Sequence, residues 1–145
     1  MIQRIQTIFL VLTAGAFLSL FELPFATTNV AAANALSDQA FDVSDHVILL
    51  ILAALGGLLA IVSIFMFKKR KTQLSLGYLL IILGILIPVA AYFTFMGEAQ
   101  ALPESAQISD GFGAYLPFAA IIFAVAANYF IKKDEKTVRS MDRLR

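Results

Sequence analysis

One histidine and two nearby aspartates have the composition of a metal site. Asp42, Asp45 and His46 lie within five residues of one another, and imidazole and carboxylate groups are common ligands of divalent metals. The same residues come directly before a long apolar run that begins at Val47. Acidic residues at a helix start cap its free N–H groups. We therefore expect Asp45 to be an N-cap and not a metal ligand.

Two further polar residues stand in apolar surroundings. Glu22 is near one end of the first apolar run, and Asn128 is one to two helical turns inside the last. Charged groups inside a membrane mark ion paths and proton relays. However, we expect Glu22 to reach the lipid headgroup region and Asn128 to bond to a neighbouring helix. A ligand contact at Asn128 is the alternative.

Motifs of known catalytic chemistry are missing from the sequence. It has no cysteine, no Ser-His-Asp pattern, no glycine-rich phosphate loop and no HExxH, which excludes thiol chemistry and disulfides and leaves an enzyme without an acid–base pair. We expect no catalytic residue, cofactor or metal.

The last residues carry a patterned set of positive charges. On a helix, Lys132, Lys136, Arg139 and Arg143 follow i, i+4, i+7 and i+11 and form one basic stripe. Such a stripe can lie on an anionic lipid leaflet or dock a cytoplasmic protein. The alternative is a solvated helical extension whose charges only fix topology.

Composition sets the class of protein. Of the 145 residues, 60% are hydrophobic and 14% are charged, and the mean hydropathy is +0.85. Soluble domains are nearer 45–50% apolar and 25% charged, so a soluble globular domain and a disordered chain are both excluded. A net charge of +1 without a basic module argues against nucleic-acid binding.

Four apolar runs are long enough to cross a bilayer as helices. They cover about residues 5–25, 47–67, 74–96 and 114–131, against the 17–25 residues that a span requires. Lys68-Lys69-Arg70-Lys71 separates the second run from the third and must be a tight loop, because four charges inside a span would cost roughly 10 kcal/mol. We predict an all-α, antiparallel four-helix membrane domain over 1–131, with external loops, and a basic amphipathic tail over 132–145.

Charge predicts the orientation. All eleven basic residues fall at the N-terminus, in the tight loop or in the tail, together with three acids, which leaves +8 on that side. The other side carries seven acids and no lysine or arginine. The positive-inside rule then places both termini in the cytoplasm.

A cleaved signal peptide is the competing interpretation of the first run, with small-residue sites at Ala33 and Ala35. Its spacing from the apolar run is long for cleavage.

Small residues recur at helical spacing in three of the runs. Helices in lipid approach closely through such residues, and Pro88 lies four residues after Gly84, which relieves the crowding at a proline kink. We expect these positions to form the seam of the bundle, and a homodimer face is the alternative. The packing residues are Ala53, Gly56, Gly57, Ala60, Gly77, Gly84, Pro88, Ala120, Ala124 and Asn128.

The two ends of the chain resemble a family. Met1-Ile2-Gln3-Arg4-Ile5-Gln6, and the ending Lys132-Lys133-Asp134-Glu135-Lys136 with Val138-Arg139-Ser140 and Asp142-Arg143-Leu144-Arg145, are similar to the ends of an uncharacterised family of small bacterial membrane proteins. The resemblance implies four spans and an inner-membrane location. It implies no activity, ligand or catalytic residue.

Two functions of different classes follow from these features. The first is a non-enzymatic scaffold or accessory subunit, whose tail contacts the lipids of the anionic leaflet or a membrane-protein partner, which includes a second copy of the chain. The second is a small transporter or channel for an apolar or weakly polar solute, with Glu22, Tyr92 and Asn128 as lining groups. An enzyme that acts on a lipid-like substrate is a third, weaker option, because no acid–base pair is present.

Overall fold

The computed structural model describes residues 2–31 and 36–142, with side chains described for 5–31 and 36–138. Four helices dominate, and short strands and 3-10 turns join them. In chain order the elements are α1 (Ile2–Ser19), β1 (Ala26–Thr28), β2 (Ala40–Phe41), η2 (Val43–Asp45), α2 (Val47–Phe65), α3 (Arg70–Ala99), β3 (Ile108–Asp110), η3 (Phe112–Tyr115) and α4 (Leu116–Asp142).

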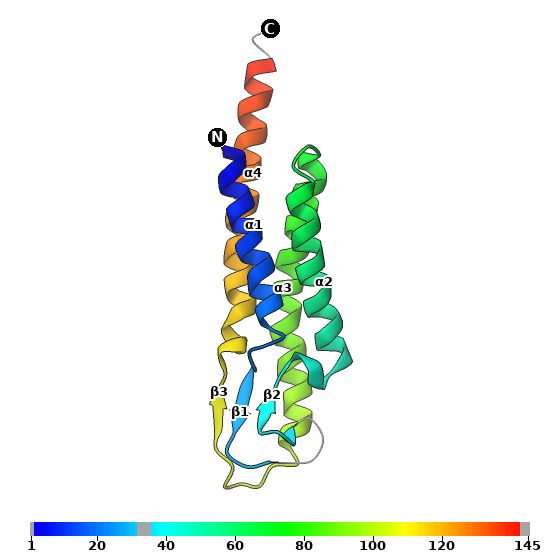
Figure 1. The fold of residues 1–145 in the computed structure, drawn as a ribbon, viewed down its shortest axis with the longest axis vertical. Helices are drawn as coiled ribbons and strands as arrows, with labels where there is room; N and C mark the ends of the chain where they lie inside the picture. Colours follow the sequence, from blue (N-terminus) through cyan, green and yellow to red (C-terminus); the bar gives the residue numbers. More distant parts are fainter. Residues whose placement is uncertain (1, 32–35, 143–145) are drawn as a thin grey trace.

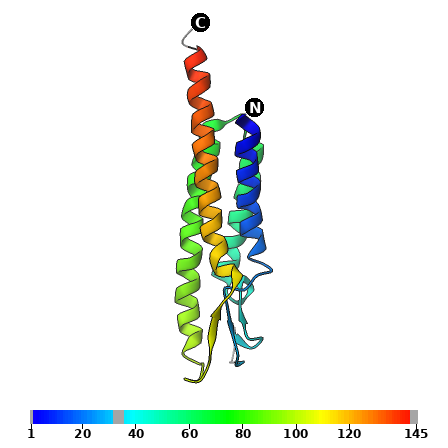
Figure 2. The same ribbon diagram turned by 90° about the vertical axis from the view of Figure 1, so that its left-hand side faces the viewer.

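The four helices lie side by side along the long axis of the molecule (Figures 1 and 2). α1 packs against α2 and α4, and α3 packs against the same two helices. The start of α1, the end of α4 and the turn between α2 and α3 share one end of the molecule (Figure 1). This end carries every lysine and arginine of the residues that the structure describes, and we name it the basic end. The strands form the opposite, sheet end.

Three helices are long and apolar enough to span a membrane: α2, α3 and the apolar part of α4. The predicted second span, 47–67, matches α2, and the third, 74–96, lies within α3. The fourth, 114–131, begins two residues before α4, which continues into the tail as one helix. Many large apolar side chains on α2, α3 and α4 face outward, among them Leu58, Ile82 and Ile122. An apolar exterior is what a hydrocarbon solvent favours.

The predicted first span, 5–25, is wrong in its outer part. α1 ends at Ser19, six residues before the predicted limit. A turn follows, in which the Glu22 and Leu23 amides both donate to the Ser19 carbonyl. Pro24 then prevents the helix from resuming, because the residue before a proline is pushed from helical to extended backbone. The chain then enters a strand, and the Phe25 amide donates to the carbonyl of Phe41.

The long connections, which we expected to be external loops, contain a three-stranded antiparallel sheet that the all-α prediction lacks. The strand order is β2-β1-β3, with Ala26 opposite Phe41 on one side and Asp110 on the other. The protein is therefore mostly helical and not purely so. The sheet covers a buried aromatic group, because Phe41 is fully buried and its ring meets that of Phe95 edge-on at 5.3 Å.

The predicted packing residues of α2 lie against α1. Ala53 and Ala60 are fully buried. A side chain at Gly56 would overlap the Phe17 ring, and one at Gly57 would approach Leu18. Each glycine thus leaves space for a large side chain of the neighbouring helix, which brings the two backbones close.

The packing residues of α3 and α4 face each other. Gly84 lies against Ile121 and the Pro117 carbonyl, and Gly77 lies against the side chain of Asn128. The α4 residues Ala120, Ala124 and Ala127 are all fully buried. α3 continues through Pro88 as one helix, although the proline removes the hydrogen bond to the carbonyl of Gly84.

Candidate functional site at the basic end

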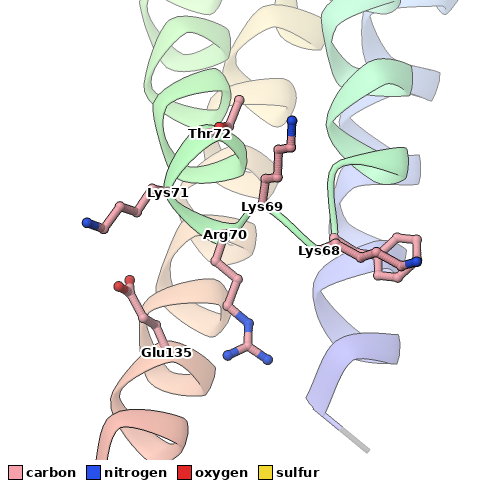
Figure 3. Close-up of a pocket in the computed structure, with 7 residues that line it drawn as sticks. Lys68, Lys69, Arg70, Lys71, Thr72 and Glu135 are labelled. Carbon is pink, nitrogen blue, oxygen red and sulfur yellow. The ribbon is translucent and has the colours of Figure 1, made fainter.

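A hollow of about 490 Å³ lies at the turn between α2 and α3. Its walls come from Phe67 to Thr72 and from Glu135 on the extension of α4. In Figure 3, Lys71 and Glu135 lie on one side, Lys68 points to the other, and Arg70 is directed between the turn and the extension of α4. Four consecutive basic side chains around one hollow make a site with the charge that phosphate groups require. We name it the basic hollow.

An ion pair fixes the turn to the last helix. Arg70, the first residue of α3, places a guanidinium nitrogen 2.9 Å from a carboxylate oxygen of Asp134. Both side chains are mostly buried, at 24% and 15% exposed, so solvent screens the pair less than it would a surface pair. The pair holds the α4 extension beside the basic hollow.

We expect Asp134→Ala to lower the free energy of unfolding by about 1 kcal/mol, since it leaves a partly buried guanidinium without its partner. The loss should shrink in high salt. Thermal unfolding in mild detergent, followed by far-ultraviolet circular dichroism, measures it. Lys133→Ala, an exposed neighbour, is the matched control and should stay within about 0.5 kcal/mol of the wild type. Equal stability of the two variants would show that the pair contributes nothing.

The predicted tail stripe is only partly within the described side chains. Lys132 and Lys136 are exposed, and the Lys132 ammonium lies 5.2 Å from the centre of the Tyr78 ring, a cation–π distance. Arg139 belongs to α4, but its side chain, like the whole of Arg143, lies outside the described residues. The tail therefore brings at least two lysines to the same end of the molecule as the basic hollow.

A second feature lies inside the helices at this end. Gln6, Ser63, Gln73 and Asn128 come from the four different helices, and each is at most 4% exposed. The Gln73 side-chain amide donates to the Ser63 carbonyl at 3.0 Å. Five other polar atoms of these residues have no hydrogen-bond partner among the described residues: Gln6 Oε1, Ser63 Oγ, Gln73 Oε1 and both amide atoms of Asn128. We name these four residues the polar layer.

Contacts between helices place the polar layer at one depth. Asn128 meets Gly77, one helical turn from Gln73, and the rings of Phe9 and Phe130 stack at 5.5 Å, next to Gln6 and Asn128. With a rise of 1.5 Å per residue, the four polar residues fall within about 8 Å along the axis. Buried polar groups without partners each cost about 1–3 kcal/mol, and ordered water is their usual partner. The polar layer is thus suited to hold water or a small polar molecule.

The histidine and aspartates take other roles than expected. The prediction that Asp45 caps α2 is wrong: the N-cap of α2 is His46, which makes no side-chain cap bond. Asp42 and Asp45 instead form a capping box around the 3-10 turn η2, in which the Asp42 amide donates to Asp45 at 2.7 Å. The acids were therefore correctly expected at a helix start, but they serve the short helix that precedes α2. Among the described residues, no group of three or more His, Cys, Asp or Glu could hold a metal ion.

Burial raises the pKa of Asp45 above its ordinary value, and the charges of Asp42 and Asp38 add to the rise, against the hydrogen bond from the Asp42 amide. The Asp45 carboxyl therefore keeps its proton to higher pH in the folded state than in the unfolded chain. Its contribution to the free energy of unfolding is lost as pH rises from the ordinary pKa through the pKa of the folded state. We expect Asp45→Asn, which keeps the acceptor oxygen, to remove this part of the pH dependence. Unfolding curves of both proteins between pH 3 and 7 measure it, and parallel curves would contradict it.

Sequence reasoning missed Gln6, Gln73, Arg70 and Asp134 as interacting residues. Gln73 lies just outside the predicted third span, 74–96. Gln6 is uncharged, so it lacks the signal of an ionisable group inside a span. Residues at similar distances before and after a tight turn lie side by side in two antiparallel helices. Counting outward from the turn in both directions therefore predicts one contact of the polar layer. Ser63 and Gln73 are such a pair.

The chain matches the profile of DUF4293, described as a domain of unknown function, over residues 2–144. The chain belongs to this family. The match covers nearly the whole chain and confirms the resemblance to an uncharacterised family that the two ends indicated. No curated protein and no solved structure matches the chain significantly.

Proposed function

We propose that the chain is a multi-pass protein of the bacterial inner membrane and serves as a non-enzymatic scaffold or accessory subunit. Its basic end lies in the cytoplasm and binds the phosphate groups of anionic lipids, which fixes the height and tilt of the helices for a membrane-protein partner or a second copy. The basic hollow carries this proposal, because three lysines line it beside the ion-paired Arg70 and close to the lysines of the α4 extension. Each basic residue near an anionic surface is worth about 1 kcal/mol.

The charge difference between the two ends supports this orientation. By sequence, the N-terminal segment, the turn and the tail sum to +8, and the two long connections with the residues that flank them sum to −7. We expect a fluorescent protein fused after Arg145 to be bright and an alkaline phosphatase fused at the same place to be inactive, because the former matures in the cytoplasm and the latter outside it. The opposite pair of results would place the basic end outside and contradict the positive-inside rule for this chain.

Lipid binding is tested by native mass spectrometry in mild detergent with dioleoyl phosphatidylglycerol. A triple variant, Lys68→Gln with Lys69→Gln and Lys71→Gln, leaves the Arg70–Asp134 pair in place and should bind this lipid at least about tenfold more weakly. The matched control replaces the same three lysines by arginine, keeps the charge and should bind as the wild type does. Unchanged binding by the glutamine variant would refute the role of the basic hollow.

The polar layer favours a second candidate function, transport of a small polar or weakly polar solute. The three lining groups expected from the sequence do not lie together, because Glu22 and Tyr92 are exposed whereas Asn128 is buried. A path would instead have to pass the polar layer. The chain has no cysteine, so a single cysteine at Gln73 or Asn128 can be probed with a charged thiol reagent. Rapid labelling at both positions would favour a water-filled path, and no labelling at either would refute it.

A further inference from the structure

An apolar trough lies between α3 and α4 and continues beneath the sheet. It consists of two hollows of about 360 Å³ each, which share Pro88, Tyr92 and Phe118. The first opens on the outer surface of the two helices and reaches Val89. The second runs toward Asp110 on β3, at the end of the molecule where the sheet meets the helices (Figure 1). We name the two together the aromatic trough.

Helix contacts bound the trough. Gly84 packs closely against Ile121 and the Pro117 carbonyl of α4, and Pro88, one turn later, lines both hollows. The Phe41 and Phe95 rings, in edge-on contact, form part of the wall below the sheet. Each hollow falls within the 300–1,000 Å³ of ordinary ligand sites, and its walls are side chains that would face hydrocarbon when α3 and α4 span a membrane.

Charge selects the class of ligand. The residues that line the trough are apolar or aromatic, except for Asp110, an exposed acid at one end, and Tyr92. The sheet end holds seven acids and no lysine or arginine in its sequence segments. A phosphate or carboxylate headgroup without a cation would be repelled there. A primary ammonium can donate hydrogen bonds to Asp110, and aromatic faces such as that of Tyr92 attract cations.

We propose that the aromatic trough binds a bilayer lipid with an ethanolamine-type headgroup. One hydrocarbon chain lies along Pro88, Val89 and Phe118, and the ammonium group meets Asp110. This inference requires that the helices span the membrane as proposed above, but it does not depend on the basic hollow. The sheet end would thereby select a lipid by its ammonium group, whereas the basic end selects one by its net negative charge.

The test compares two lipids with the same chains, dioleoyl phosphatidylethanolamine and dioleoyl phosphatidylglycerol, by native mass spectrometry of the full chain in mild detergent. Asp110→Asn should weaken binding of the ethanolamine lipid by about tenfold, the worth of one charge-assisted hydrogen bond, and leave the glycerol lipid unchanged. The lysine-to-glutamine triple variant should weaken binding of the glycerol lipid and leave binding of the ethanolamine lipid unchanged. Glu104→Gln, an exposed acid of the same connection that does not line the trough, is the control for charge and should change neither.

A second variant tests the trough itself. Val89→Trp adds an indole from an exposed position, 47% exposed, so it fills the first hollow without disturbing the core. It should weaken the ethanolamine lipid several-fold, and Ile122→Trp, on the exposed face of α4 away from the trough, should not. Unchanged binding of this lipid by Asp110→Asn or by Val89→Trp would overturn the inference. The response of the glycerol lipid to the triple variant would then still decide the proposed function by itself.

Discussion

Gly77→Ala should destabilise the protein by about 2 kcal/mol, although alanine favours a helix over glycine. The added methyl group would overlap the side-chain amide of Asn128, which is 4% exposed and enclosed between α3 and α4. Either the amide must leave its position or the two helices must separate, and overpacking of this kind typically costs 1–3 kcal/mol. Thermal unfolding in detergent measures the loss.

A double variant separates this clash from a general defect. Gly77→Ala combined with Asn128→Ala removes the group that the new methyl would meet, so its stability should return to that of Asn128→Ala alone. Gly15→Ala is the matched control, because it also replaces a glycine within a helix, but nothing lies within 4 Å of its added carbon. It should be neutral or stabilise by up to about 1 kcal/mol. If Gly77→Ala destabilised the Asn128→Ala protein as much as it destabilises the wild type, the clash would not involve Asn128.

This pair also shows how far sequence reasoning reached. The spacing of Gly77 and Gly84 predicted a close helix contact, and Asn128 was expected to bond to a neighbouring helix. In the structure Gly77 lies directly against the side-chain amide of Asn128. The amide atoms have no hydrogen-bond partner among the described residues. A pattern along one helix gives the face that packs, but the partner on another helix depends on relative depth, which is set by the lengths of the connections.

The helical structure of the apolar runs was predictable for a physical reason. Lipid leaves no partner for a free backbone group, so a long apolar run must be a helix, and α2 begins at Val47 as expected. The sheet has no comparable signal. Its strands are two and three residues long, and β1 pairs with β3 about 80 residues away. A strand of three residues is too short to show an alternating pattern, and its pairing depends on contacts made after the helices have packed.

Two glycines before α4 connect that sheet to the helices. The Gly111 amide donates to the Phe25 carbonyl and the Gly113 amide to the Pro24 carbonyl, both at 2.9 Å. A side chain at either glycine would overlap the backbone of residues 23–25. Backbone atoms cannot turn aside as a flexible side chain can, so the segment must move and both hydrogen bonds weaken. The connection before α4 therefore holds the chain that follows α1.

We accordingly expect Gly113→Ala to cost about 3–4 kcal/mol, the sum of an overpacked contact and the loss of one or two buried hydrogen bonds. The helices should keep most of their circular dichroism, because the damage is confined to the sheet end, whereas amide exchange at residues 26–28 should become much faster. Gly97→Ala is the matched control at the same end, since nothing lies within 4 Å of its added carbon. Slow exchange of Ala26–Thr28 in Gly113→Ala would mean that the sheet does not depend on this contact, and that α1 is held by its packing against α2 and α4 alone.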